Sequence, residues 1–150
     1  RGGQMIVKNA AGEKHDIVFH HFFPTNRKRI AKLLDFISDN LDKRDKYYGI
    51  MMKYLTSRYI AADYEIEVLK AERQAKNRAL HEAHVQQANL RKRAKWMSAS
   101  TFRDKNRALE ETIMLIERRK LEITLELSAA KHLKDRLKIN TQLMVEVKPW

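Results

Sequence analysis

The sequence predicts a mainly α-helical protein whose centre is a long antiparallel helical hairpin with coiled-coil-like packing. The chain of 150 residues contains only four glycines and two prolines, so few positions interrupt a helix. One apolar seam keeps helical spacing from residue 48 to residue 97, and a short Ser/Thr-rich segment then separates it from a second long helical pattern. With a short amphipathic helix and a small N-terminal β-hairpin added, we expect a single elongated domain over residues 1–150.

A β-hairpin is expected over residues 4–23. Residues 4–8 and 15–23 are rich in β-branched and aromatic side chains, and residues 9–13 carry turn-forming types. A lone hairpin is marginal in water, and the alternation of Leu143, Val145 and Val147 with polar or flexible residues suggests a third strand over residues 142–148. The alternative for this tail is the frayed end of the preceding helix.

The first helix is expected over residues 25–42. Thr25 or Asn26 supplies an N-cap. Apolar residues then recur at three- and four-residue steps from Ile30 to Leu41, with charged residues elsewhere on the wheel. This spacing is typical of an amphipathic helix with one buried face.

A long second helix is expected over residues 45–97, which contain no proline and one glycine, Gly49. Alternating steps of three and four residues define a seam in which twelve of fifteen positions are apolar or aromatic, so one register holds throughout. The seam positions are Tyr48, Met52, Leu55, Tyr59, Ala62, Ile66, Leu69, Arg73, Lys76, Leu80, Ala83, Gln87, Leu90, Ala94 and Met97.

A long third helix is expected over residues 101–139. Thr101 and Asp104 resemble a capping box, and the short turn before them makes the two long helices antiparallel neighbours. A turn centred near residues 99 and 100 would bring three oppositely charged pairs together: Arg91 with Glu110, Arg73 with Glu126, and Glu82 with Arg118. The apolar positions of this helix are Leu109, Ile113, Ile116, Ile123, Leu127, Ala130 and Leu137.

Several functional classes are disfavoured by what the sequence lacks. It contains no cysteine, which excludes disulfides and thiol chemistry and fits an intracellular, reducing location whose compartment is not specified. No phosphate-binding or dinucleotide-binding glycine motif is present, so we expect no catalytic residues, no cofactor and no enzymatic activity. No run of 18 apolar residues is present, and we expect no transmembrane segment. The sequence begins at Arg1, and we expect a processed chain or part of a longer one.

Two groups of residues have both a functional and a structural interpretation. His81 and His84 lie three apart and can share a helix face, but they lack further ligands, and we expect two solvated histidines and no metal site. Five tyrosines lie within residues 47–64. Exposed, they would offer surfaces for base stacking, but we expect them to pack in the core.

The strongest departure from an ordinary helix is a cationic segment. Residues 70–95 hold eight Lys or Arg against two Glu, a net charge of +6, and the seam is least apolar there. More cations and an aromatic residue follow at the turn, so we expect binding of a polyanion, since phosphate backbones attract such surfaces. The alternative is a solvated lysine-rich face. The candidate binding residues are Lys70, Arg73, Lys76, Arg78, Arg91, Lys92, Arg93, Lys95, Trp96, Arg103, Lys105 and Arg107.

The formal net charge of +12 implies an acidic partner. We expect a non-enzymatic structural or accessory protein that binds nucleic acid without sequence specificity, in a ribonucleoprotein or a DNA-packaging assembly. The alternative is an assembly or scaffolding protein that binds an acidic protein or forms a homo-oligomer through its coiled-coil seam.

Overall fold

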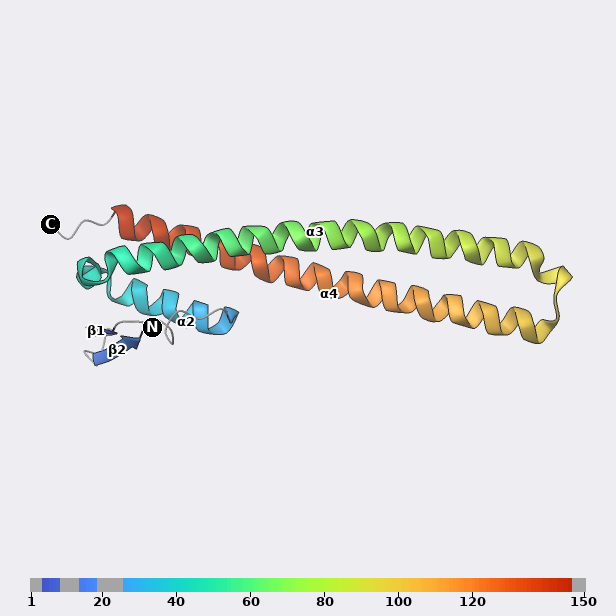
Figure 1. The fold of residues 1–150 in the computed structure, drawn as a ribbon, viewed down its shortest axis with the longest axis horizontal. Coiled ribbons are helices and arrows are strands. Elements are labelled where there is room, and N and C mark those ends of the chain that lie inside the picture. Colours follow the sequence, from blue (N-terminus) through green and yellow to red (C-terminus); the bar gives the residue numbers. More distant parts are fainter. Residues whose placement is uncertain (1–3, 9–13, 19–25, 147–150) are drawn as a thin grey trace. The chain divides into compact units, whose positions relative to one another are not determined.

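The computed structural model describes residues 4–8, 14–18 and 26–146 and is mainly helical (Figure 1). Two long helices, α3 (Tyr48–Arg93) and α4 (Ala99–Glu146), follow a shorter helix, α2 (Arg27–Asp39). The chain divides into two compact units: the first contains residues 1–65 and 130–150, and the second contains residues 66–129. Both long helices contribute to each unit.

Two short strands lie within the segment where a β-hairpin was expected. β1 (Gln4–Lys8) pairs antiparallel with β2 (Lys14–Val18), with Met5 opposite Ile17 and Val7 opposite His15. The expected turn at residues 9–13 and the segment 19–25 lie outside the described residues.

The helix α2 is capped by an asparagine at each end. The Asn26 side chain accepts hydrogen bonds from the backbone N–H groups of Lys28 and Arg29, at 2.9 and 3.4 Å, as an N-cap does. Asn40 is buried and closes the other end, donating its amide to the Phe36 carbonyl while its own carbonyl accepts the Tyr47 hydroxyl at 2.7 Å. The helix therefore stops at Asp39, earlier than the expected residue 42, and a 3₁₀ helix, η1 (Leu41–Lys46), precedes α3.

The core of the first unit is formed by one face of α2, the start of α3 and the end of α4. Four apolar residues of α2 between Ile30 and Ile37 are buried, as its periodicity predicted. They pack in one cluster with Leu55 of α3 and with Leu137 and Met144 of α4. Tyr47 and Tyr54 are buried in the same cluster and Tyr59 packs against it, which confirms the structural interpretation for these tyrosines; Tyr64 is exposed.

Polar contacts align the end of α4 with α2 in this unit. Buried Asn140 donates its amide to the Leu34 carbonyl at 3.0 Å and to the Ser38 hydroxyl at 3.2 Å. Arg136 pairs with Asp35 at 2.7 Å on the same side. Leu137, Asn140 and Met144 follow each other at helical steps, and all three are buried.

The expectation of a C-terminal strand over residues 142–148 is wrong for its described part. α4 continues to Glu146, well beyond the expected end at residue 139, because Asn140 and Met144 bury a helical face against α2. Val145, which the strand pattern placed beside Leu143, is 49% exposed. Residues 147 and 148 lie outside the described residues.

The second unit is an antiparallel helical hairpin, as predicted. Ile66, Leu69, Ala83 and Leu90 of α3 are buried, and so are Ile116, Ile123 and Leu127 of α4. Over the whole of α3 and the turn, all fifteen predicted seam positions are buried or half-buried. At Gln87 the seam carries a hydrogen bond instead of an apolar contact, because its amide donates to the Asn106 side chain at 3.3 Å.

The turn of the hairpin lies earlier than expected. α3 ends at Arg93, a 3₁₀ turn, η2 (Ala94–Trp96), follows, and α4 begins at Ala99 instead of residue 101. Ser98, not Thr101, is the cap: its hydroxyl accepts the Thr101 backbone N–H at 3.2 Å, and its carbonyl accepts that of Phe102 at 3.0 Å. This shift changes which residues face each other.

The three expected ion pairs are wrong for that reason. Among the described residues, neither Arg91 nor Arg73 pairs with the glutamate assigned to it, and Glu82 does not pair with Arg118. Two α3–α4 ion pairs do form among the described residues: Glu72 with Arg119 in the second unit, and Asp63 with Lys134 in the first.

Candidate nucleic-acid interface

The candidate interface is the hairpin tip, defined as residues 91–107, which comprise the last turn of α3, η2 and the first turns of α4. Seven of these residues are Lys or Arg, and Asp104 is the single acidic residue among them. All seven cations are exposed. They are Arg91, Lys92, Arg93, Lys95, Arg103, Lys105 and Arg107.

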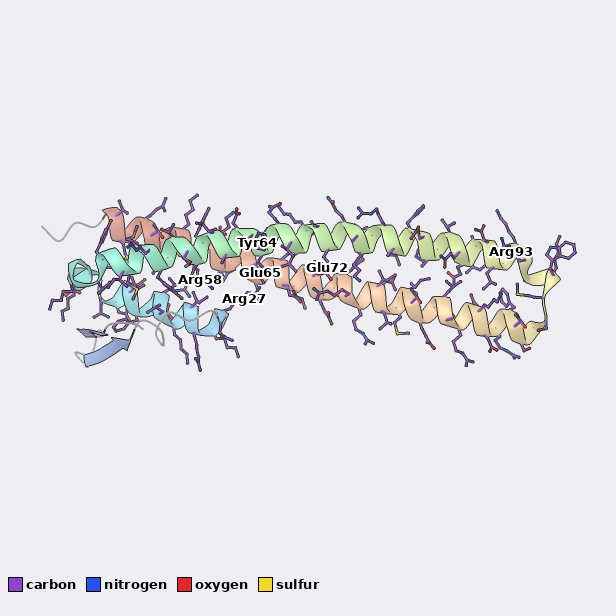
Figure 2. All side chains as sticks on the ribbon, viewed as in Figure 1. Arg27, Arg58, Tyr64, Glu65, Glu72 and Arg93 are labelled. Carbon is purple, nitrogen blue, oxygen red and sulfur yellow. The ribbon has the colours of Figure 1, made fainter. Side chains whose placement is uncertain are left out.

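The charges of the tip are not compensated within the part of the chain that the structure describes, where none of the seven cations forms an ion pair. In Figure 2, the side chain of Arg93 extends from α3 beside the turn. Cations that are exposed and unpaired keep their full attraction for an external polyanion over about one Debye length, roughly 8 Å at physiological salt.

Trp96 is the most exposed large apolar residue of those described, with 78% of its surface accessible. It ends η2, and the Lys95 ammonium nitrogen lies 5.3 Å from its ring centroid, within the range of a cation–π contact. The indole therefore contributes little to packing and is available to a partner.

The four remaining candidates lie elsewhere on the hairpin. Lys70, Arg73, Lys76 and Arg78 are 13 to 21 residues before Arg91 on α3, which is about 20 to 30 Å at 1.5 Å per residue. The twelve predicted residues therefore do not form one cluster. The eight at the tip come together, and the four on α3 form a separate group.

This upstream group is partly neutralised by neighbouring carboxylates. Lys70 lies 3.8 Å from Glu67 in an (i, i+3) pair, and Lys76 contributes to lowering the pKa of Glu72. Arg73 and Lys76 are half-buried on the seam and Lys70 is half-buried beside it, whereas Arg78 is exposed. These positions make the upstream group a weaker candidate than the tip.

Sequence reasoning missed a cluster around Arg119. Its guanidinium donates two hydrogen bonds of 2.7 Å to the Glu72 carboxylate on α3, one of 2.9 Å to Glu126 and one of 3.3 Å to Glu122 (Glu72 is labelled in Figure 2). The hydrogen bond from Arg119 is the main reason why the pKa of Glu72 is lowered, and the hydrogen bond to Glu72 is the main reason why the pKa of Arg119 is raised. The cluster joins α3 to α4, and its single guanidinium is shared by three carboxylates.

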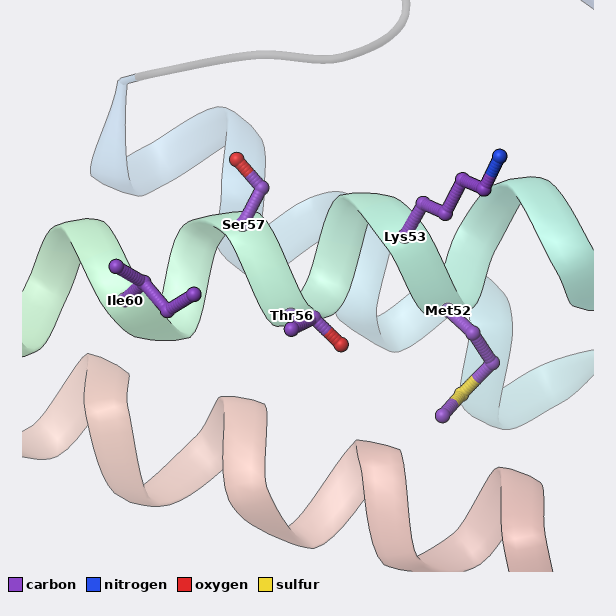
Figure 3. Close-up of a pocket in the computed structure, with 5 residues that line it drawn as sticks. All are labelled: Met52, Lys53, Thr56, Ser57 and Ile60. Carbon is purple, nitrogen blue, oxygen red and sulfur yellow. The ribbon is translucent and has the colours of Figure 1, made fainter.

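Two hollows on the described surface are each lined by residues of α3 alone. The hollow in Figure 3 is lined by residues of a single helix, α3, and Lys53 is the one charged residue among Met52, Lys53, Thr56, Ser57 and Ile60. Another lies beside Arg78, His81 and Glu82. Within the described residues no group of three or more His, Cys, Asp or Glu is placed to hold a metal ion, and His81 and His84 are both exposed.

Comparison with known proteins adds no functional assignment. No protein-family model matches the chain, and no curated protein or solved structure is significantly similar to it. Of the described helices, none is long and apolar enough to cross a membrane.

Proposed function

We propose that this chain is a non-enzymatic structural or accessory protein that binds nucleic acid without sequence specificity through the hairpin tip. The observation that supports the proposal is the group of seven exposed cations within 17 residues, none of which forms an ion pair with a described residue. Phosphate contacts supply most of the energy of non-specific nucleic-acid binding. Recognition of a backbone requires no pocket and no base-reading geometry, and RNA and DNA are both suitable ligands.

The test is a titration of labelled RNA and DNA by fluorescence anisotropy at several salt concentrations. We expect binding at low salt and a steep loss of affinity as salt rises, because each phosphate contact releases condensed counterions. Replacing Arg91, Lys92, Arg93 and Lys95 by Gln reduces the slope of log K against log salt by about 3 if all four contact phosphates of a single strand.

A matched control removes the same charge from elsewhere. Lys32, Lys46, Lys131 and Lys138 are exposed and lie in the first unit, so their replacement by Gln lowers the net charge equally. We expect the control variant to retain most of the salt slope. Equal losses in both variants would show that net charge, not the tip, drives binding, and absence of binding by the unmodified chain at low salt would refute the proposal.

The alternative function, assembly through helix packing, is favoured by one separate observation in the second unit. Met114, Leu121 and Leu125 of α4 are 55%, 68% and 72% exposed, and their spacing places them on the face opposite the buried Ile123. Exposed apolar stripes of this kind mark surfaces that another helix covers. Light scattering at increasing concentration distinguishes the two: a monomer at all concentrations counts against self-assembly, and an oligomer that Leu121→Gln with Leu125→Gln dissociates favours it.

A further inference from the structure

Trp96 occupies a position that the fold does not require. A buried tryptophan removes about 150 to 250 Å² from water and contributes strongly to a core. Trp96 instead leaves 78% of its surface accessible, and the turn is held without it by the Ser98 cap. Exposure of so large an apolar ring carries a solvation cost that a partner surface would remove.

The surroundings of Trp96 define the chemistry of that partner. The ring is preceded by Arg91, Lys92, Arg93 and Lys95, and the cations of α4 begin seven residues after it, at Arg103. Arg91, Lys92 and Arg93 end α3 three to five residues before Trp96, and Lys95 is the neighbour of Trp96 in η2. A ligand that suits the site has a flat, aromatic face flanked at short distance by negative charges. A nucleotide with its neighbouring phosphates has both features.

We propose that the hairpin tip prefers unpaired nucleotides, with the indole of Trp96 stacked on a base while the surrounding cations hold the flanking phosphates. This inference rests on the proposed function and specifies its substrate class. In a duplex, base faces are covered by their neighbours, so stacking on Trp96 requires a single strand, a loop or an end. Stacking on an aromatic side chain tolerates every base, which is consistent with binding that ignores sequence.

The experiment compares ligands of equal length. The full chain carries two tryptophans, so Trp150→Phe leaves Trp96 as the single tryptophan reporter. Its fluorescence is titrated with an oligothymidine strand of about ten nucleotides, within the site sizes of single-strand binders. An abasic strand and a duplex of the same length serve as comparison ligands. We expect the oligothymidine strand to quench Trp96 strongly, and the abasic strand to quench it less and to bind more weakly.

Substitution then separates stacking from charge. Anisotropy with Trp96→Ala should show affinity for the single strand reduced by at least about fivefold, the lower end of the range for losing one stacked base. Its affinity for the duplex and its salt slope should stay unchanged. Trp96→Phe, which retains an aromatic face, should keep most of the single-strand affinity. Circular dichroism of each variant should match that of the unmodified chain, since the exposed ring supports no core contact.

The outcomes distinguish this inference from the proposed function. If Trp96→Ala weakens single-strand and duplex binding equally, or weakens neither, stacking is overturned while non-specific binding stands. If Trp96→Phe loses as much single-strand affinity as Trp96→Ala, stacking is also overturned. If the unmodified chain binds none of the ligands at low salt, the proposed function and this inference fail together.

Discussion

Leu137 and Ile139 test whether burial of α4 stabilises the first unit. They lie two residues apart on α4, one buried and the other exposed. Leu137 is 0% exposed and belongs to the core cluster, whereas Ile139 is 55% exposed. Replacing each by Ala truncates a large aliphatic side chain within the same helix. The difference between the two variants therefore isolates the effect of burial from that of helix propensity.

The expected magnitude follows from the buried volume. Leu137→Ala removes three methyl or methylene groups, worth roughly 0.8 kcal/mol each on transfer from water. The cavity left behind adds to this loss, and fully buried Leu→Ala substitutions cost about 2 to 5 kcal/mol. Ile139→Ala removes little buried surface and introduces a better helix former, so its effect should stay within about 0.5 kcal/mol.

Urea unfolding followed by circular dichroism at 222 nm measures both variants. With a slope of about 2 kcal/mol per molar urea, a loss of about 3 kcal/mol lowers the midpoint by roughly 1.5 M. The Ile139→Ala midpoint should move by less than about 0.3 M. A small loss in Leu137→Ala, or equal losses in the two variants, would refute the packing of α4 against α2 and α3 described here.

Two further predictions concern the pH dependence of stability. Burial raises the pKa of Tyr54 from 10.0 to about 12, against the opposing charge of Arg58, so the neutral phenol stabilises the folded state fully below pH 10 and this contribution is lost as the pH rises towards 12. The free energy of unfolding, measured with urea between pH 9 and about pH 12, should therefore fall more steeply with pH for the unmodified chain than for Tyr54→Phe. Equal slopes in the two proteins would contradict the burial of the hydroxyl. The hydrogen bond from Arg119 lowers the pKa of Glu72 below 4.5, so its contribution is present in full above pH 4.5 and is lost as the pH falls below that value. In Glu72→Gln, the free energy of unfolding should fall less steeply as the pH drops below 4.5. Glu117→Gln changes an exposed residue of α4 and serves as the control that keeps the fall seen in the unmodified chain. The same pH dependence in the two variants would exclude the Glu72–Arg119 pair as a stabilising contact.

The periodic features of the sequence predicted the helices well. All fifteen seam positions of α3 and the turn are protected from solvent, and so is the expected face of α2. Periodicity succeeds here because a helix that buries one face must repeat its apolar residues every three or four positions. The rule is local, so it can be applied without knowing what covers the face.

Helix ends were predicted less well, because tertiary contacts decide them. The last two turns of α4 depend on Asn140 and Met144, and Asn140 is a polar residue that a hydrophobic pattern does not count. Its partners on α2 are more than a hundred residues away in the sequence. The apolar residues at 143, 145 and 147 alternate as they do in a strand. Met144, however, lies seven residues after Leu137, which is the spacing of one helix face.

The Arg119 cluster was missed for a related reason. Its bond to Glu72 depends on the register between α3 and α4, and the assumed turn centre was displaced by about three residues. One indication was present in the sequence: the apolar seam of α4 passes from Ile116 to Ile123 without an apolar residue at 119 or 120. A charged residue at such a gap is expected to find partners across the helix pair.

The charges of the tip are explained only in part by the energetics of the two helices. Arg91, Lys92 and Arg93 lie in the last turn of α3, where cations favour the negative end of the helix dipole. Arg103, Lys105 and Arg107 lie beyond the first turn of α4, which begins at Ala99, so the helix dipole has little effect on them. The dipole therefore accounts for the cations of α3 and not for those of α4.

Repulsion between the cations of the tip is a cost to the hairpin. Asp104 is the single acidic residue within the tip, and the glutamates of α4 begin only beyond it, at Glu110. The α4 cations of the tip gain nothing from a helix dipole, repel one another and form no ion pair among the described residues, so they do not stabilise the hairpin. Their presence is better explained by an anion outside the chain, and the exposed ring of Trp96 among them favours an anion that carries bases.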